Sequence, residues 1–221
     1  MNLLLRFSNI HLQYQNGTIL TEVIKGINFV IHQNERLAIV GKSGSGKTSL
    51  LMLMAGLEKP TSGQITYQDQ IITSYTEDKL TDFRKKNIGI VFQSFYLIPN
   101  YTALENVALS LEINSQKNAL NLAKEILIDL GLEDRLQHFP SQLSGGEQQR
   151  VAIARAIIKK PELILADEPT GNLDDENTQV ITDLIFSVSK KYQKSLCLVT
   201  HDMDLAQRCD RIMKIENGTI V

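Results

Sequence analysis

The chain has little of what marks secreted or membrane-spanning proteins. It contains two cysteines, five prolines and no tryptophan in 221 residues. Cys197 and Cys209 stand in unrelated contexts, so we expect reduced structural thiols of a cytosolic protein and not the disulfide framework of a small secreted domain. No apolar run approaches the ~18 residues that a membrane-spanning helix needs. The apolar run at residues 3–5 lacks a basic leader and a small-residue cleavage site, so we expect no signal peptide.

Positive and negative charges are nearly balanced in the sequence. The formal net charge is −2, and no overall positive field indicates a nucleic-acid partner. The chain has no repeat, low-complexity tract or long linker. The rest of the composition, with 43% hydrophobic and 22% charged residues, is that of an ordinary globular protein. The length suits one or two domains with a sizeable core.

One stretch, residues 41–48, carries a motif with a known physical basis. Its sequence, GKSGSGKT, fits G-x-x-x-x-G-K-[ST] at every fixed position. An apolar run at residues 36–40 precedes it and a helix-forming run at residues 49–55 follows, which predicts strand, glycine loop and helix in that order. Such a loop points backbone N–H groups at phosphate oxygens beside the positive end of a helix. We expect Lys47 to reach the β- and γ-phosphates and Thr48 to offer its hydroxyl to Mg²⁺.

Two carboxylates and a histidine follow other apolar runs. Asp167 and Glu168 end the run that starts at residue 163, and in phosphate-loop enzymes an Asp in this place serves the metal ion. The adjacent Glu is suited to act as a general base on the attacking water. His201 follows the apolar residues 195–200, and ligand groups of open α/β sheets gather at the C-terminal ends of strands. Solvated acids and an ordinary strand-end histidine are the plainer alternatives.

A second helix start has features of an anion site. In the run LSGGEQQR at residues 143–150, Ser144 can cap a helix and Glu147 stands at capping-box spacing. A Ser-Gly-Gly start exposes backbone N–H groups in the same way as the first loop. Taken alone, this stretch is best interpreted as an ordinary capped helix. Together with the first loop, a second phosphate-binding helix end is the better interpretation.

An aromatic residue precedes the glycine loop. Tyr14 lies in an expected strand, and an aromatic ring near a phosphate loop can stack on a purine face. A tyrosine that simply packs on its sheet is the more common case, because strands are rich in Tyr.

The hydrophobic pattern predicts the remaining elements. Residues 102–132 have apolar side chains at helical spacing and look like a helical insertion in an α/β core. Asn34 is expected in a left-handed turn before the loop strand. The other expected elements are antiparallel strands at 3–7, 10–14 and 23–31, strands at 64–67 and 87–92, helices at 78–86 and 177–191, and a hairpin formed by 211–216 and 219–221.

In order and spacing, these motifs resemble those of the ATP-binding subunit of ATP-binding-cassette (ABC) transporters over nearly the whole chain. Residues 41–48 are similar to the family's Walker A loop and residues 163–167 to Walker B, with Glu168 in the place of the catalytic base. The run at residues 143–150 resembles the family signature, which no other phosphate-loop class has. The resemblance also matches Gln93 to the Q-loop, Asp174 to the D-loop, His201 to the switch histidine and Tyr14 to the aromatic residue that stacks on adenine.

The resemblance thus implies a full set of site residues. They are catalytic Glu168, His201 and Lys47; ATP-binding Tyr14, Gly41, Lys42, Ser43, Gly44, Ser45, Gly46, Lys47, Thr48, Ser49 and Gln93; signature residues Ser144, Gly145, Gly146 and Gln148, which contact the nucleotide of a partner subunit; Asp174 in the D-loop; and metal-binding Thr48, Gln93 and Asp167.

Shorter runs narrow the resemblance within the family. Residues 166–174 (ADEPTGNLD) and 102–107 (TALENV) are similar to the group that includes LolD, MacB and FtsE. Residues 91–99 and 208–211 look most like the bacterial YbbA type. Two departures are small: Thr48-Ser49 replaces the commoner Ser-Thr and keeps the metal hydroxyl, and Asn34 stands where Gly is usual.

The resemblance implies one ABC ATP-binding domain over residues 1–221. We expect an α/β phosphate-loop ATPase core with an antiparallel β subdomain at residues 1–93 and 144–221, and a helical subdomain at 94–143. The implied protein binds ATP and Mg²⁺, hydrolyses ATP and forms a head-to-tail homodimer when ATP is bound. It lies on the cytoplasmic face of the bacterial inner membrane, where it powers a permease for export, lipoprotein release or mechanical work, and it has no nucleic-acid partner.

Two other classes deserve comparison. Mechanical ATPases of chromosome maintenance share the signature but carry a long coiled coil, for which residues 94–143 leave no room. An ATP-switched regulatory subunit of an FtsE-like membrane complex would carry the same residues and stays open as an alternative. A neighbouring gene for a membrane protein with four spans and a large extracytoplasmic region would favour the transporter.

Overall fold

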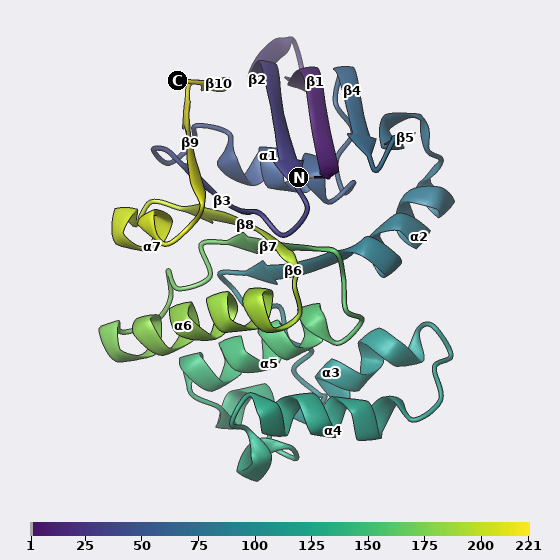
Figure 1. The fold of residues 1–221 in the computed structure, drawn as a ribbon, viewed down its shortest axis with the longest axis vertical. Helices are drawn as coiled ribbons and strands as arrows, with labels where there is room; N and C mark the ends of the chain where they lie inside the picture. Colours follow the sequence, from purple (N-terminus) through teal and green to yellow (C-terminus); the bar gives the residue numbers. More distant parts are fainter. Residues whose placement is uncertain (1) are drawn as a thin grey trace.

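Two β-sheets and several helices are stacked in layers in the computed structural model, which describes residues 2–221 (Figure 1). The antiparallel sheet lies at one end of the long axis, the mostly parallel sheet in the middle, and the helices α3 to α6 at the other end. This arrangement confirms the expected α/β class with a separate antiparallel sheet. Among residues 2–221, no helix is both long and apolar enough to cross a membrane.

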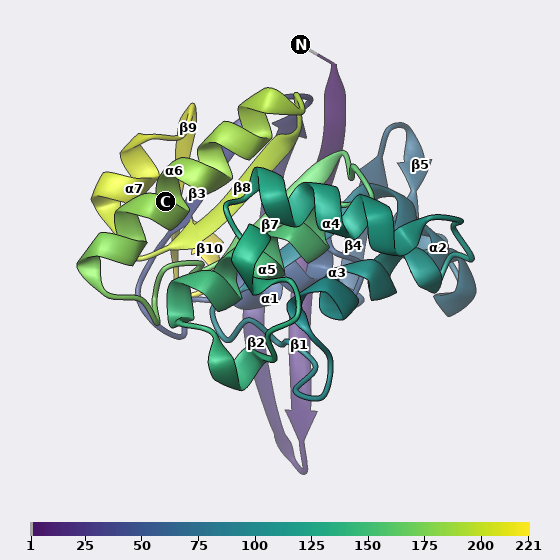
Figure 2. The ribbon, with the colours of Figure 1, turned by 90° about the horizontal axis from the view of Figure 1, so that it is seen from below.

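The antiparallel sheet has the strand order β2-β1-β4-β5. Its strands are β1 (Leu3–Asn16), β2 (Ile19–His32), β4 (Ser62–Tyr67) and β5 (Gln70–Ile71). The two strands expected at 3–7 and 10–14 are wrong as separate elements, because β1 continues through them. The interruption is a bulge, where Asn9 has a φ of 49° and the register shifts between Phe7 and Ile10. The β1–β2 hairpin extends beyond the rest of the chain in Figure 2.

The mostly parallel sheet has the order β10-β9-β3-β8-β7-β6. Its strands are β3 (Arg36–Val40), β6 (Ile88–Phe92), β7 (Leu163–Asp167), β8 (Ser195–Thr200), β9 (Arg211–Glu216) and β10 (Thr219–Ile220), and only β10 runs antiparallel. Every residue of β8 is buried, as are the first four of β7 and the last four of β3. Burial on both faces is why these strands are continuous apolar runs in the sequence.

Helices cover both faces of this sheet. The longer ones are α1 (Lys47–Met54), α2 (Glu77–Asn87), α3 (Ala103–Glu112), α4 (Ala119–Asp129), α5 (Gly145–Ile157) and α6 (Asp175–Lys191). α1 lies between the two sheets, while α5 and α6 cover the opposite face of the parallel sheet (Figure 1). α3 and α4 pack on α5 as an outer layer. Two large apolar clusters form the core, one on each side of the parallel sheet.

Short elements depart from the expectations. α7 (Met203–Gln207), β5 and three 3₁₀ turns at residues 72–74, 133–135 and 140–142 were not predicted. Each has five residues or fewer, too few for a periodic apolar pattern. The helix expected at 177–191 begins at Asp175, because Asp174 caps it. The left-handed turn expected at Asn34 is confirmed by its φ of 63°.

Candidate active site

The glycine loop joins β3 to α1 and leaves the start of that helix open. Gly44 and Gly46 have φ of 76° and 103°, in the left-handed region. Gly46 is the N-cap of α1, and the helix has no side-chain cap and no acidic residue in its first turn. Helices α2, α3, α5, α6 and α7, by contrast, are each capped by a side chain. The first N–H groups of α1 are therefore left for an anionic ligand.

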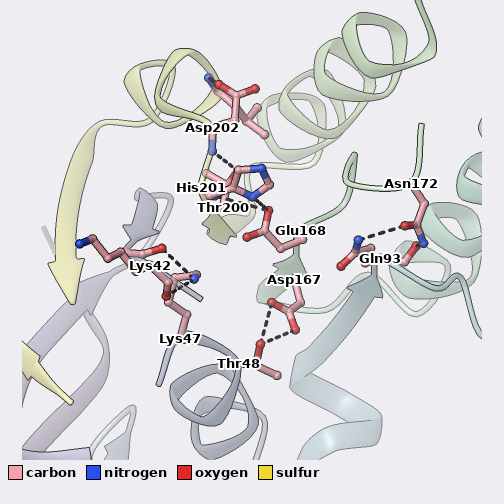
Figure 3. Close-up of polar contacts among 12 residues, drawn as sticks. Lys42, Lys47, Thr48, Gln93, Asp167, Glu168, Asn172, Thr200, His201 and Asp202 are labelled. Atoms are coloured by element: carbon pink, nitrogen blue, oxygen red, sulfur yellow. Dashed lines mark hydrogen bonds and ion pairs between the residues drawn. The ribbon is translucent and has the colours of Figure 1, made fainter. Parts of the chain in front are cut away.

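Lys47 lies over the loop that precedes it. Its Nζ donates to the carbonyl oxygens of Gly41 at 2.9 Å and Lys42 at 3.0 Å (Figure 3). The residue is only 8% exposed, although it carries a full charge. Among residues 2–221 the Lys47 ammonium forms no ion pair with a carboxylate, so its charge is left to attract a phosphate.

Thr48 and Asp167 meet from two different elements. The Thr48 hydroxyl, on the first turn of α1, donates to Asp167 Oδ2 at 3.0 Å at the end of β7. Burial raises the pKa of Asp167, and the Thr48 hydrogen bond and the charge of Lys47 oppose this shift. A hydroxyl and a carboxylate are the hard oxygen ligands that Mg²⁺ prefers, and Mg²⁺ usually completes its shell with phosphate and water. The pair thus fits the predicted metal role. Within residues 2–221 no cluster of three or more His, Cys, Asp or Glu side chains offers a cage made by the protein alone.

Glu168 and His201 form a second pair at the same edge of the sheet. His201 Nδ1 lies 2.9 Å from Glu168 Oε2, and the His201 backbone N–H donates to the same oxygen at 3.4 Å. The Glu168 side chain is 18% exposed and the His201 side chain 73%. Glu168 also has a φ of 44°, an uncommon backbone conformation for a residue with a side chain. Such conformations cluster at functional sites, where they aim a side chain.

Gln93 is held by a residue that sequence reasoning missed. Its Nε2 donates to Asn172 Oδ1 at 3.0 Å, and Asn172 Nδ2 donates back to the Gln93 carbonyl at 3.0 Å (Figure 3). Gly171 allows the two segments of the chain to approach each other, since a Cβ at this position would lie 2.8 Å from Gln93 Nε2. The contact joins the end of β6 to the loop after β7. The residues around Asn172 in the sequence do not indicate that it contacts Gln93.

Most of these side chains line one cavity of about 550 Å³, although Asp167 and Asn172 lie behind its lining residues Thr48 and Gln93. Its lining is formed by Val23, Ser43, Gly44, Gly46, Lys47, Thr48, Ser49, Gln93, Glu168 and His201. Of these lining residues, only Val23 was not predicted as a site residue. Its sequence context is that of an ordinary apolar strand residue, which does not indicate a position in a binding cavity. Gly41, Lys42 and Ser45 do not line it; Lys42 and Ser45 face a separate cavity of about 230 Å³ on the other side of the loop.

Tyr14 does not line the cavity. Its side chain is exposed. Its hydroxyl donates at 3.3 Å to Oε2 of Glu58, which lies in the segment that follows α1. Burial and the charge of Glu58 raise the pKa of the phenol. The Tyr14 side chain thus lies near the end of α1. Its stacking on adenine stays a prediction.

The expected signature and D-loop residues form a second group, away from the cavity lining. Ser144 caps α5 in a capping box with Glu147, whose carboxylate accepts from the Ser144 N–H at 2.8 Å. A Cβ on Gly146 would overlap the side-chain oxygen of Asn177, and Asp174 accepts from the Asn177 N–H at 2.8 Å. The starts of α5 and α6 are thus packed together. Gln148 is turned back onto the Leu143 carbonyl at 3.1 Å.

Comparisons with known proteins find a matching family model and close relatives. The family model described as "ABC transporter" matches residues 24–171. The chain is 45% identical to the lipoprotein-releasing system ATP-binding protein LolD of Idiomarina loihiensis, over 98% of this chain and 96% of the relative. It is 46% identical to the uncharacterized ABC transporter ATP-binding protein YbbA of Escherichia coli K12, over 90% of this chain and 88% of the relative.

Solved structures give the same result. A dimeric structure of MJ0796, described as a bacterial ABC transporter cassette, superposes with a TM-score of 0.90 at 37% identity and covers 98% of this chain and 96% of its own. The same cassette in a post-hydrolysis state bound to ADP and Pi superposes with a TM-score of 0.90.

Proposed function

The chain belongs to the ABC transporter family as an ATP-binding subunit and ATPase, and from this premise we propose that it powers a membrane permease of the LolD or MacB type. The high identity to a LolD protein over nearly the full length supports this choice. In this proposal the chain acts at the cytoplasmic face of the inner membrane. The parallel-sheet core and antiparallel sheet (residues 1–93 and 144–221) bind ATP, and the helical subdomain (94–143) transmits the motion.

The observation that carries the proposal is the convergence of four groups at one edge of the parallel sheet, each with at least one residue that lines the cavity. The open start of α1, the Lys47 ammonium, the Thr48–Asp167 pair and the Glu168–His201 pair all reach the same edge of the sheet. A bound Mg²⁺ held by Thr48 and Asp167 would neutralise charge that develops on the phosphates. The loop N–H groups and Lys47 hold and orient the triphosphate.

Glu168 is placed to take the proton of the attacking water. Its carboxylate is mostly shielded from solvent and is anchored by the His201 ring and backbone N–H. Anchoring one oxygen leaves the other to accept a proton in a fixed orientation, which general-base catalysis requires. The exposed His201 ring also has a nitrogen left to contact the terminal phosphate.

Gln93 connects this cavity with the proposed permease-contacting region. It lines the cavity, yet it directly precedes residues 94–143 and is tied to Asn172. A change at the terminal phosphate that pulls Gln93 from Asn172 would move the start of the helical subdomain. This is the step that couples ATP to the permease in our proposal.

Lys47→Ala is expected to weaken ATP binding by roughly 10–150-fold, because charge-assisted contacts contribute ~1.5–3 kcal/mol. Titration calorimetry on the folded variants measures it. Lys47→Met keeps the buried stem and removes only the charge, and should bind ATP as weakly as Lys47→Ala. Unchanged affinity in Lys47→Met would make the lysine a packing residue.

The permease coupling is tested by reconstitution. The chain is purified alone and together with the membrane protein encoded beside its gene, in lipid nanodiscs. We expect stable co-purification and an ATPase rate several-fold above that of the free chain. A partner with a small extracytoplasmic region whose presence leaves the rate unchanged would favour the FtsE-like switch, and failure to form any complex would contradict both assignments.

A further inference from the structure

The turn of the C-terminal hairpin lies against the back of the glycine loop. β9 and β10 are joined at Asn217 and Gly218, and β10 lies beside β2 (Figure 1). Backbone hydrogen bonds connect this turn to β2 and to the loop before α1. We propose that Gly218 is a positioning residue, which fixes the phosphate-binding geometry of the loop through backbone contacts. The inference rests on the proposed nucleotide site and assigns to it a residue far away in the sequence.

The backbone of one residue, Gly218, connects three separate segments. The Gly218 N–H donates to the Ser45 carbonyl at 3.2 Å, and the Gly218 carbonyl accepts from the Lys25 N–H at 2.9 Å. The hairpin turn therefore bridges the glycine loop and β2. The position of Ser45 depends on backbone hydrogen bonds, because its buried hydroxyl has no hydrogen-bond partner among the described residues. Its N–H donates within the loop to the Lys42 carbonyl at 3.2 Å.

The junction has no room for side chains. Gly218 has a φ of 82°, and a Cβ on it would overlap the carbonyl oxygen of Val23. A Cβ on Gly46 would lie 3.1 Å from that same oxygen and 2.9 Å from the Ile24 side chain. At the other end of the loop, a Cβ on Gly41 would overlap the carbonyl oxygen of Ile215 in β9. Both ends of the loop are thus packed backbone to backbone against β2 and the hairpin.

A shift at this junction reaches the ligand side directly. Val23, whose carbonyl touches both Gly46 and Gly218, also lines the 550 Å³ cavity. Gly46 is the N-cap of α1, so its position sets the direction of the first N–H groups of that helix. Displacements on the order of 1 Å in a positioning shell can cost about 100-fold in function.

The first test is Gly218→Ala with a matched control. Gly17 also has a left-handed φ, 61°, but a Cβ on it would meet nothing within 4 Å, and it lies in the β1–β2 turn. Gly17→Ala therefore imposes a similar backbone strain without the clash. ADP is the probe, because it is not hydrolysed and lacks the terminal phosphate needed for the ATP-dependent dimer that the family resemblance implies. Affinity is measured by calorimetry at a temperature where circular dichroism shows each variant folded.

We expect the ADP dissociation constant to rise about tenfold or more in Gly218→Ala and to stay within about twofold of the parent in Gly17→Ala. A lowered melting temperature with unchanged affinity would make Gly218 merely structural and overturn the inference. Failure of the parent chain itself to bind ADP would instead refute the proposed nucleotide site.

A second measurement uses the unaltered chain, in case Gly218→Ala does not fold. Hydrogen exchange followed by mass spectrometry compares the free and ADP-bound protein. If the turn and the loop move as one unit, ADP slows exchange in a peptide spanning residues 214–221, none of which lines the cavity. Unchanged exchange there, with protection over residues 41–49, would overturn the inference.

Discussion

Glutamine in place of Glu168 is expected to leave ATP binding intact and to lower kcat by ~10²–10⁴-fold, the usual contribution of a positioned general base. The amide has nearly the same shape as the carboxylate and can still accept from the His201 backbone N–H, which reaches Glu168 at 3.4 Å. It cannot take a proton from water. The structure therefore predicts that chemistry fails while the site stays assembled.

The matched control for this variant lies next to the same strand. Glu162 directly precedes β7, at the end opposite Glu168, and pairs with Lys194 at 2.9 Å. Glu162→Gln removes a carboxylate of the same type without touching the cavity and should keep the parent kcat. Both variants are assayed for steady-state ATPase activity and for ATP affinity by calorimetry. Near-normal turnover by Glu168→Gln would require another general base and would show that Glu168 does not have this role.

The glycine loop and its flanking elements could be predicted because their signal is local. Strand, loop and helix are consecutive, and the expected order is confirmed by β3, residues 41–46 and α1. The capping box at Ser144 and Glu147 is likewise confirmed, since both partners lie within one turn of helix. The residues that decide these features are neighbours in the sequence, so no tertiary contact is needed to predict them.

Contacts between distant segments gave no sequence signal. Asn172 holds Gln93 because β6 and β7 pair in parallel, with Phe92 opposite Asp167, so that the residues after both strands emerge at one edge. The Asn217-Gly218 turn is confirmed as a hairpin turn, but its bond to Ser45 depends on where β9 docks beside β3. Such partners follow from strand order in the sheet, which a periodicity cannot reveal.

The irregularity in the first strand also involves a contact with a distant segment. The sequence predicts two strands, at residues 3–7 and 10–14, where the structure has one, β1. The structure keeps the strand and absorbs the extra residue in a bulge at Asn9, beside Gly63, where a Cβ would overlap the Asn9 carbonyl oxygen. Sequence alone does not separate a bulge from a strand end, because both lose the alternation.

ATP-dependent dimerisation is the second large effect that we expect. The group formed by Ser144, Gly145, Gly146 and Asp174 does not line the cavity of its own chain. The starts of α5 and α6 are nevertheless packed into one surface, and Ser144 is exposed on it. The MJ0796 cassette, which shares this fold, is described as dimeric. The Ser144 hydroxyl caps only the Glu147 N–H, and the start of α5 does not line the cavity of its own chain, so we expect it to act as a donor to the nucleotide of a second copy.

In the proposed head-to-tail dimer, each ATP is held between the glycine loop of one copy and the α5 start of the other. Loss of the terminal phosphate removes the contact that distinguishes the closed from the open state, and with it the driving force for closure. The chain should therefore be monomeric without nucleotide. It should dimerise when ATP is bound but not hydrolysed, which the Glu168→Gln background provides.

Light scattering on Glu168→Gln with ATP and Mg²⁺ is expected to show a dimer, and the double variant with Ser144→Arg a monomer that still binds ATP. Because Ser144 also caps α5, its loss costs about 1 kcal/mol of stability, which must be separated from the steric block. Thr76→Arg is the matched control: Thr76 is an exposed N-cap residue of α2 whose side chain also accepts from the N–H three residues on, and α2 belongs to neither group. This control should dimerise like the Glu168→Gln parent. A dimer that survives Ser144→Arg, or that forms equally well without ATP, would leave the α5 start with no nucleotide to bind.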